Sequence, residues 1–347
     1  MILSRVFLFP YWLVLKLRNA AYDHGWCKRV RHPVPVITVG NITVGGTGKT
    51  PMVEYLCRLL QEDRRVAVLS RGYKRKSRGF RLVESGDKAS FVGDEPLQVK
   101  RKFPDVLVAV DKNRNHGVRQ LLALPEAQRP DVILLDDGFQ YRKLQPACNL
   151  LLVDYNRPVF EDQLLPFGRL RDLPEQLRRA DAVIVTKTPG LVDDAERAAM
   201  RQRLHLNADH PLLFTSIRYD EPRPVFPKEA DKRYLYSQEA FLFTGVADDR
   251  PLRVQLIDRY AHIDHKRYGD HHTFTRADQR ALQRYVRRHP RTVLLTTEKD
   301  AMRLLHCTHL GVDVRTRLFY LPIEQVFQSP EEEAFFAKLI CRTENNS

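Results

Sequence analysis

A glycine-rich segment near the amino terminus has residue types suited to binding a chain of phosphates. The sequence GNITVGGTGKTP runs from Gly40 to Pro51, between an apolar run and a segment typical of a helix. A strand, a glycine-rich turn and a helix N-terminus direct backbone N–H groups at phosphate oxygens. Lys49 can reach the terminal phosphates, and the Thr50 hydroxyl can hold Mg²⁺. Thr43 stands where the standard pattern has glycine, so flexibility must come from the glycines that follow. The expected ATP-binding residues are Thr43, Val44, Gly45, Gly46, Thr47, Gly48, Lys49 and Thr50.

Two aspartates follow an apolar run at a place where a Mg²⁺ site would need them. Asp136 and Asp137 come directly after the run from Val132 to Leu135, which is the pattern of the acidic strand end in P-loop enzymes. Mg²⁺ usually keeps several waters and takes one or two protein carboxylates, so some nearby acids lie in its outer shell. The expected metal-site residues are Thr50, Glu95, Asp136 and Asp137.

Basic residues are in excess, and the formal net charge is +14 at pH 7. Such a surplus indicates an anionic partner, which can be nucleic acid, a phospholipid surface or a phosphorylated substrate. Residues 71–81 contain six cations and no acid, as expected of either a solvated loop or a phosphate-binding segment. Arg169 and Arg171 form a second basic group, and the fork of a guanidinium suits phosphate well.

The order of the apolar runs predicts the elements that position these residues. Short β-branched runs alternate with helical stretches through the first two thirds of the chain, and the runs are apolar on both faces. This pattern predicts an α/β fold with a parallel sheet of the P-loop NTPase type and helices on both of its faces. Residues 219–232 contain three prolines and many charges, so we expect a linker there. Residues 1–225 are the expected amino-terminal helix and P-loop domain, and residues 226–347 a smaller α/β domain.

The amino terminus carries an apolar run that is too short to cross a bilayer. The run from Val6 to Leu17 has 12 residues and includes Pro10 and Lys16, whereas a spanning helix needs about 20 apolar residues. It can be a helix of the core, or a helix in the membrane interface with Phe7, Phe9, Tyr11 and Trp12 at the headgroups. Basic residues follow the run, which favours contact of residues 1–18 with an anionic membrane surface.

Six motifs together resemble one enzyme family. They are GNITVGGTGKTP, LSRGYKR (residues 69–75), VGDEP (92–96), LDDGFQ (135–140), LPFGRLRD (165–172) and GDHHTF (269–274). Their order and spacing are similar to those of the tetraacyldisaccharide 4′-kinase family of lipid A synthesis. The resemblance implies transfer of the γ-phosphate of ATP, with Mg²⁺, to the 4′-hydroxyl of tetraacyldisaccharide 1-phosphate. It also implies work at the cytoplasmic face of the inner membrane, in a cleft between two domains.

The same resemblance implies roles for individual residues. Asp94 matches the family's catalytic aspartate, and His271 matches the histidine that works with it as a dyad, while Lys49 acts on the phosphates. Taken alone, Asp94 is better explained as the N-cap of a helix than as a catalytic residue. Thr297 to Asp300 are likewise better explained as a helix cap than as chemistry. Asp172 stands where the family commonly has glutamate. The expected substrate-binding residues are Arg71, Tyr73, Gln140, Arg169 and Arg171.

Other classes of protein fit the sequence less well. Five widely spaced cysteines without a C-x-x-C pair indicate reduced thiols and exclude a disulfide-stapled miniprotein. A soluble P-loop kinase or ligase of a small metabolite would explain the phosphate loop if the amino terminus were simply core. A nucleic-acid-binding ATPase would explain the charge, but aromatic residues do not interleave the basic runs and no nucleic-acid module is recognisable. We therefore expect a phosphorylated glycolipid as the partner, with no nucleic acid and no obligate protein partner.

Overall fold

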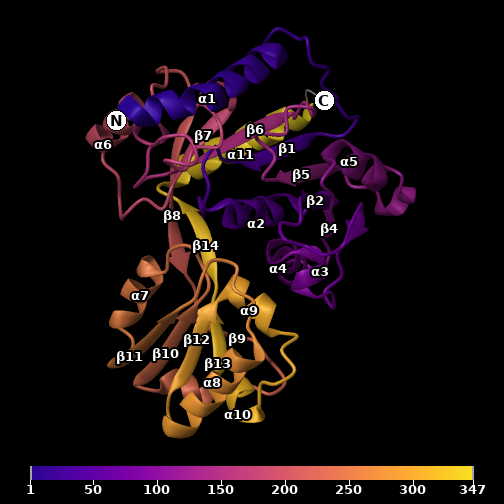
Figure 1. Ribbon diagram of the computed structural model, residues 1–347. Coiled ribbons are helices and arrows are strands. Elements are labelled where there is room, and N and C mark those ends of the chain that lie inside the picture. The colour runs from indigo at the N-terminus through magenta and orange to yellow at the C-terminus, as the bar shows by residue number, and fades with distance from the viewer. Residues whose placement is uncertain (1, 346–347) are drawn as a thin grey trace.

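Two sheets, each covered by helices, make up the chain (Figure 1). The computed structural model describes the backbone of residues 2–345 and the side chains of residues 8–342. The larger sheet has nine strands in the order β14-β8-β7-β6-β1-β5-β2-β4-β3, and its edge strands β14 and β3 run antiparallel to their neighbours. Its strands are β1 (Val36–Gly40), β2 (Val66–Ser70), β3 (Arg81–Leu82), β4 (Leu107–Val110), β5 (Val132–Asp136), β6 (Cys148–Asp154), β7 (Ala182–Thr186), β8 (Leu212–Tyr219) and β14 (Ile323–Phe327).

Helices pack on both faces of this sheet because its central strands are apolar on both sides. Val68 faces a core cluster that includes residues of α2, α4 and α11, whereas its neighbour Leu69 faces the side covered by α5. Residues of α1 and α6 cover that second side beside β6 and β7. The prediction of a P-loop-type parallel sheet with helices on both faces is confirmed. The helices of this part are α1 (Ile2–Asp23), α2 (Lys49–Leu60), α3 (Ala89–Val92), α4 (Asp94–Lys102), α5 (Arg114–Leu122), α6 (Asp194–Arg203) and α11 (Pro330–Asn345).

A smaller sheet of five strands forms the lower part of the molecule in Figure 1. Its order is β11-β10-β12-β13-β9, parallel except for β9, which runs antiparallel to β13. Its strands are β9 (Arg223–Pro224), β10 (Glu239–Thr244), β11 (His262–Arg267), β12 (Val293–Thr297) and β13 (Leu318–Leu321). Its helices are α7 (Arg250–Ile257), α8 (Arg276–Arg288), α9 (Glu298–Leu304) and α10 (Val312–Arg315).

Short 3₁₀ turns also occur along the chain, at Glu126–Gln128, Val159–Glu161, Pro174–Arg179 and Lys232–Tyr236.

The chain returns to the larger sheet after the smaller one, which differs from the expected division at residue 225. β14 pairs with β8 from Ile323 to Phe327, and Phe336 and Ile340 of α11 are buried in the core of the larger sheet. The last strand and helix therefore lie with the larger sheet, although the expected division assigns them to the smaller domain of residues 226–347. The linker expected at residues 219–232 contains β9, which pairs with β13.

The register of β1 and β5 brings the phosphate loop and the acidic strand end together. Val39 of β1 lies opposite Asp136 of β5 in a parallel pair, so both strands end at the same edge of the sheet. The chain passes closely there, because a Cβ on Gly40 would lie 2.5 Å from the Cβ of Phe139. Glycine at position 40 therefore permits the two loops to pack against each other.

The amino-terminal helix α1 rests on the larger sheet with one side exposed. Leu15 and Asn19 are buried, whereas Phe9, Val14 and Leu17 are each more than half exposed. Tyr11 is about one third exposed, and Trp12 packs against the core, so not all the aromatic residues expected at the headgroups are free. Residue 1 and the side chains of residues 2–7, including Val6 and Phe7, lie outside the described part. Among residues 2–345, no helix is long and apolar enough to cross a membrane.

Candidate active site

The phosphate loop is held in shape by side chains around it. Helix α2 begins at Lys49, directly after Gly48, whose φ of 82° lies in the left-handed region that favours glycine. The side chain of Asn41 donates a hydrogen bond to the Thr47 hydroxyl at 2.8 Å, and the Thr186 hydroxyl donates to the Thr47 carbonyl at 3.0 Å. The loop from β1 to α2 is thus fixed from within and from the neighbouring strand β7. Its residues 43–50 are those that the sequence selected.

Lys49 and Arg171 both contact Asp137 at the end of β5. Lys49 Nζ lies 3.6 Å from Asp137 Oδ1, and Arg171 donates to both carboxylate oxygens at 3.0 and 3.3 Å. Although burial alone would raise the pKa of Asp137, these two cations lower it to about 2. Asp137 is therefore ionised and ion-paired, and it holds the Lys49 ammonium at the phosphate loop.

Asp136 differs from its neighbour because no cation pairs with it directly. The Ser70 hydroxyl donates to Asp136 Oδ2 at 3.0 Å, while the buried Oδ1 has no hydrogen-bond partner. Burial, Glu95 and Asp137 raise the pKa of Asp136 to about 7. A bare carboxylate oxygen among negative charges is where a divalent cation would be stabilised. No group of three or more potential ligands from His, Cys, Asp and Glu occurs among the described side chains, but Mg²⁺ needs only one or two carboxylates. The residues present therefore fit Mg²⁺.

Glu95 lies between the phosphate loop and the smaller sheet. It forms an ion pair with Lys299 of α9. Burial and the negative charge of Asp94 favour a higher pKa for Glu95. The positive charges of Lys299 and Lys49 outweigh them, so the pKa of Glu95 is lowered. Burial would in turn lower the pKa of Lys299, but Glu95 and Asp94 raise it to about 12. Glu95 is thus neutralised mainly by a cation that comes from the other sheet.

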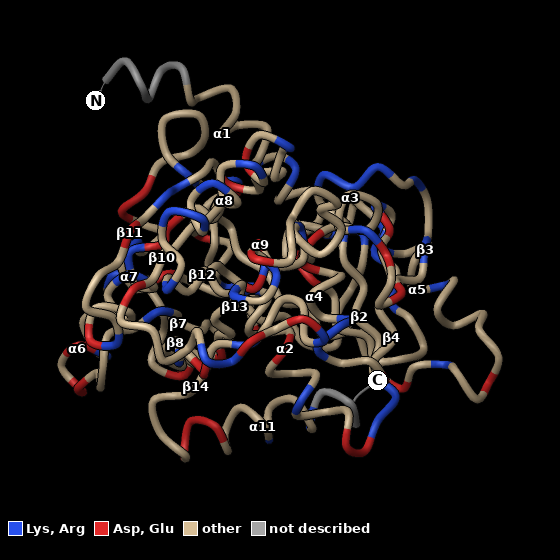
Figure 2. The backbone as a smooth tube through the Cα atoms, turned by 90° about the horizontal axis from the view of Figure 1, so that it is seen from below, with Lys and Arg blue, Asp and Glu red and all other residues tan. Residues whose placement is uncertain are grey.

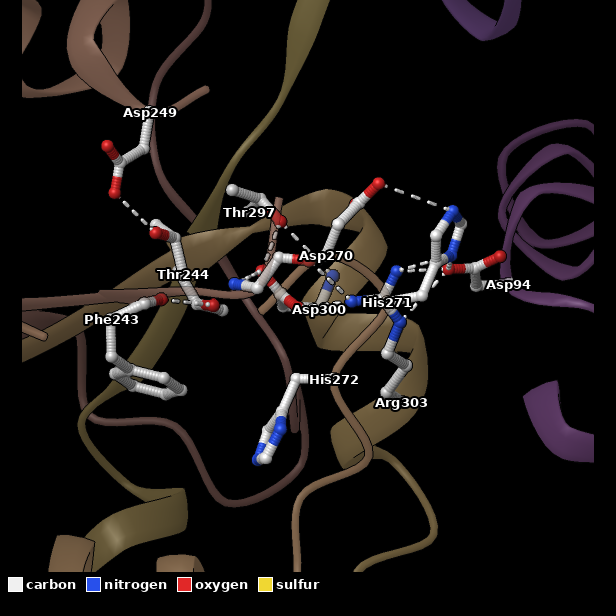
Figure 3. A network of polar contacts seen from close by, with 12 residues as sticks. Asp94, Phe243, Thr244, Asp249, Asp270, His271, His272, Thr297, Asp300 and Arg303 are labelled. Atoms are coloured by element: carbon white, nitrogen blue, oxygen red, sulfur yellow. Dashed lines mark hydrogen bonds and ion pairs between the residues drawn. The ribbon is translucent and has the colours of Figure 1, made fainter. Parts of the chain in front are cut away.

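Asp94 and His271 meet although they belong to different sheets (Figure 3). His271 Nδ1 lies 3.0 Å from Asp94 Oδ2, and its other ring nitrogen, Nε2, lies 4.0 Å from Asp270. The ring of Tyr73 packs against the His271 ring, with centroids 5.3 Å apart. Asp94 is the first residue of α4 and Gly93 is the N-cap, so Asp94 does not have the cap position that was the alternative explanation.

Arg303 of α9 contacts Asp94 through two of its nitrogens. Its Nε lies 2.9 Å from Asp94 Oδ2, its Nη2 also contacts that oxygen, and its Nη1 donates to Asp300 Oδ1 at 2.6 Å (Figure 3). Burial would raise the pKa of Asp94, but the hydrogen bond from His271 and the charges of Arg303 and Lys299 lower it far below its usual range. Asp94 is therefore a permanent carboxylate and a weak base.

Sequence reasoning did not select Lys299 or Arg303. Thr297 does cap α9, accepting a hydrogen bond from the Asp300 N–H, so the expected cap is present. The same helix also carries Lys299 and Arg303 four residues apart, a spacing that places both side chains on one face. That spacing was the available signal, but their partners 204 and 209 residues away are known only from the fold.

The expected substrate-binding residues fall into two groups around the site. Arg169 and Arg171 lie on a loop that pairs with the phosphate loop, since the Val44 N–H donates to the Arg169 carbonyl at 2.8 Å. Gln140 joins this group by donating to the Asn41 carbonyl at 2.9 Å. Tyr73 lies on the other side, against His271. Arg71 is also near the acidic strand end. Burial and the charge of Arg71 lower the pKa of Arg114, whereas the charge of Asp137 raises that pKa.

Asp172 connects this loop to the amino-terminal helix. Its fully buried carboxylate accepts hydrogen bonds from Asn19 at 2.7 Å and from Arg18 at 3.3 Å. The Tyr11 hydroxyl also donates to the Arg171 carbonyl at 3.3 Å. Asp172 therefore anchors α1 beside the site.

The fold and site define a P-loop phosphotransferase. A phosphate loop follows β1, an acidic pair ends the neighbouring strand β5, and a carboxylate–imidazole pair lies next to them. A family model described as tetraacyldisaccharide-1-P 4′-kinase matches residues 1–341, and the chain belongs to this family.

Individual proteins agree with this assignment. The tetraacyldisaccharide 4′-kinase of Parabacteroides distasonis is 43% identical over 95% of this chain and 91% of that protein. The enzyme of the same name from Phocaeicola vulgatus is 40% identical over 95% of this chain and 92% of that protein. A crystal structure of LpxK from Aquifex aeolicus in complex with ATP superposes with a TM-score of 0.73, at 29% identity, covering 98% of this chain and 99% of that one. The chain is an ATP-dependent kinase of lipid A biosynthesis that phosphorylates the 4′-hydroxyl of tetraacyldisaccharide 1-phosphate. This confirms the expected function over a soluble kinase or ligase of a small metabolite.

Proposed function

We propose that this kinase builds its active site from both sheets, with ATP at the phosphate loop and the lipid hydroxyl next to the Asp94–His271 pair. The observation that carries the proposal is a continuous group of charged side chains. It runs from Lys49 and Asp136 through Glu95 to Asp94 and His271, because Glu95 affects the pKa of Asp136 and is adjacent to Asp94. Nucleotide phosphates and the attacking hydroxyl would therefore meet in one place.

The phosphate loop and its acidic neighbours would bind the nucleotide and Mg²⁺. Backbone N–H groups of residues 43–50 and the Lys49 ammonium bind phosphate oxygens. Thr50 and Asp136 are the proposed direct metal residues, while Asp137 and Glu95 lie outside direct coordination because cations already neutralise them. When bound, the ion neutralises charge on the β- and γ-phosphates. Full activity in EDTA without added divalent cation would contradict this assignment.

His271 would accept the proton of the 4′-hydroxyl. The ionised Asp94 favours the tautomer with a proton on Nδ1, which leaves the Nε2 lone pair free to accept a proton. As the hydroxyl oxygen bonds to the γ-phosphorus, the bond from that phosphorus to the bridging oxygen breaks and ADP leaves with its electron pair. The hydroxyl proton passes to Nε2, and the nearby Asp270 carboxylate stabilises the resulting imidazolium. Asp94 orients the ring without accepting the proton, because its pKa is far too low.

The basic and polar residues around this group would hold the substrate. Arg169 and Arg171 can contact phosphate oxygens through their guanidinium forks. Tyr73 packs against His271 and can cover one side of the bound sugar. Arg71 and Gln140 complete the proposed set of substrate-binding residues.

Two adjacent histidines allow a matched test of this mechanism. In a kinase assay with ATP-Mg²⁺ and purified tetraacyldisaccharide 1-phosphate, His271→Gln is expected to lower kcat by about 10² to 10⁴-fold, the usual contribution of general base catalysis. His272→Gln is the control, because His272 Nε2 contacts Asp278 instead of the Asp94 group. Wild-type kcat in His271→Gln would exclude His271 as the proton acceptor.

We further propose that α1 binds the enzyme to the cytoplasmic face of the inner membrane. Phe9, Leu13, Val14 and Leu17 form an exposed apolar side on this helix. Apolar side chains of this kind enter the headgroup boundary when basic residues lie nearby, and Lys16 and Arg18 are on the same helix. Asp172 anchors α1 next to the substrate loop, so the membrane contact would lie beside the site that receives the lipid.

Vesicle co-sedimentation tests this proposal with a closely matched control. Val14→Ser/Leu17→Ser removes two side chains that are 62% and 61% exposed, and Val254→Ser/Ile257→Ser removes two on α7 that are 65% and 64% exposed. The first variant is expected to bind vesicles containing anionic phospholipid more weakly than wild type, and the second to bind as wild type does. Equal binding by all three proteins would refute the role of α1.

A further inference from the structure

Helix α8 of the smaller sheet carries a row of exposed arginines. Its buried side consists of Gln279, Leu282 and Val286, which pack towards the smaller sheet. The opposite, exposed side contains the arginine row, defined as Arg276, Arg280, Arg284, Arg287 and Arg288. At 1.5 Å of rise per residue, these positions span about 18 Å along the helix.

The arginine row is not neutralised by acidic side chains of the chain itself. Among the side chains that the structure describes, none of these five guanidinium groups forms an ion pair with Asp or Glu. Asp278 is the nearest acid in the sequence, but its carboxylate accepts a hydrogen bond from the Thr275 N–H and contacts His272 Nε2. Cations at positions i and i+4 of a helix repel each other. Such a row is therefore unfavourable to the isolated protein, and an external anionic surface would relieve the repulsion.

The helix that carries the arginine row lies towards the same side of the molecule as α1, for which we propose membrane contact. Seen from below in Figure 2, α8 lies towards the same side as α1, and α3, which follows the basic segment of residues 71–81, also lies there. Helix α11 lies on the opposite side. Leu282 and Val286 of α8 are buried against the smaller sheet, so the arginine row lies on the face of the helix away from that sheet. In this view α1 and α8 therefore lie towards the same side of the molecule.

We propose that the arginine row of α8 is a second membrane-docking surface, which binds the anionic phospholipid headgroups of the bilayer that α1 enters. This inference rests on the proposed membrane association of α1. A straight row of cations suits an extended anionic surface better than a single phosphate, and the exposed side of α8 has no large apolar residue that would insert below the headgroups. α1 thus supplies apolar insertion, and α8 supplies electrostatic attraction.

The position of α8 connects this contact to the chemistry. The helix begins five residues after His271, and its cap, Thr275, belongs to the same loop. Docking of α8 on the bilayer would therefore hold the His271 loop near the surface from which the lipid arrives. Both sheets would contact the membrane, one through α1 and one through α8.

Vesicle co-sedimentation of the full chain tests the inference with a charge-matched control. Arg280→Gln/Arg284→Gln removes two charges from the arginine row, and Lys338→Gln/Arg342→Gln removes two exposed charges from α11 on the opposite side. The vesicles contain phosphatidylethanolamine and the anionic lipid phosphatidylglycerol. The α8 variant is expected to bind them roughly 25-fold more weakly than wild type, since each basic group near an anionic surface contributes about fivefold. The α11 variant is expected to bind within about twofold of wild type, because α11 lies on the opposite side of the molecule and salt screens distant charges.

The outcomes separate this inference from the proposal about α1. If wild type binds anionic vesicles and the α8 and α11 variants bind alike, the arginine row is not a docking surface and the α1 proposal stands. If wild type does not bind at all, both fail. If the α8 variant loses binding to an RNA duplex and keeps its binding to vesicles, the partner of the row is nucleic acid and the inference is overturned. Unchanged kinase activity of the α8 variant in detergent micelles shows that any loss of vesicle binding is not loss of folding.

Discussion

Arg303 Nε lies 2.9 Å from Asp94 Oδ2, and this ion pair joins α9 of the smaller sheet to the first turn of α4. His271 Nδ1 approaches the same carboxylate oxygen at 3.0 Å and lies 3.2 Å from Arg303 Nη2. A guanidinium can only donate hydrogen bonds, so it competes with His271 for Asp94 and keeps that carboxylate ionised. Arg303 is therefore a positioning residue, whose action on the proposed proton acceptor passes through Asp94.

Replacing Arg303 is expected to disturb catalysis more than nucleotide binding. Arg303→Met should lower kcat at least tenfold with little change in the KM for ATP, because Asp94 loses its main cation. Arg303→Lys keeps the charge and should retain more activity. If Arg303→Lys were no more active than Arg303→Met, the charge beside Asp94 would not matter and the role would be contradicted.

Lys49 is expected to be required for turnover. Lys49→Met should lower kcat at least 100-fold, because the ammonium that contacts Asp137 would no longer reach the ATP phosphates. Arg65→Met is the control. Arg65 pairs with Asp131, which precedes β5, whereas Asp137 follows β5. Kinase assays under saturating ATP measure both. Similar activities of the two variants would show that Lys49 does not act on the phosphates.

Asp172 is expected to couple α1 to the substrate loop. Asp172→Ala leaves the buried Asn19 amide without its acceptor, which typically costs about 1 to 3 kcal/mol in the free energy of unfolding. The kcat/KM for the lipid should fall about tenfold, while the KM for ATP should change little, because the phosphate loop does not contact Asp172. Asp172→Glu should recover part of the loss. A larger effect on ATP than on the lipid would refute this coupling.

Glu298 is expected to make stability depend on pH. Burial and the nearby Glu54 raise the pKa of Glu298 to about 7 from 4.5, although Lys102 opposes them. Between these values the folded protein keeps a proton that the unfolded chain releases, so the free energy of unfolding falls as pH rises through that window. Glu298→Gln removes the ionisable group and should stabilise the protein at pH 8 by about 1 to 3 kcal/mol, with little effect at pH 4.5.

Thermal unfolding at the two pH values measures this difference. The exposed Glu62→Gln is the control for loss of one charge. If Glu298→Gln changed stability equally at pH 4.5 and pH 8, Glu298 would not be protonated in the folded protein near neutral pH.

The sequence predicted those parts of the site that are local in the chain. The phosphate loop depends on neighbouring residues, since β1, Gly48 and the start of α2 follow one another directly. The parallel sheet was predictable because strands such as Val66–Ser70 are apolar on both faces. Asp136 and Asp137 could be selected because they end such a strand. The approach of Asp94 to His271 was an implication of the family resemblance, and spacing alone did not indicate it.

The tertiary structure decided the contacts between distant segments. Arg303 and Lys299 lie on α9, for which the sequence predicted only a helix cap. Their partners at the start of α4 depend on how the two sheets face each other. β14 joins β8 rather than the smaller sheet because strand pairing depends on non-local hydrogen bonds, which no local pattern encodes. The sequence by itself thus determined the phosphate-binding chemistry and the class of fold. Only the packing of the two sheets determined which cations neutralise Asp94 and Glu95, because charge compensation in a buried site depends on distance in space and not on distance along the chain.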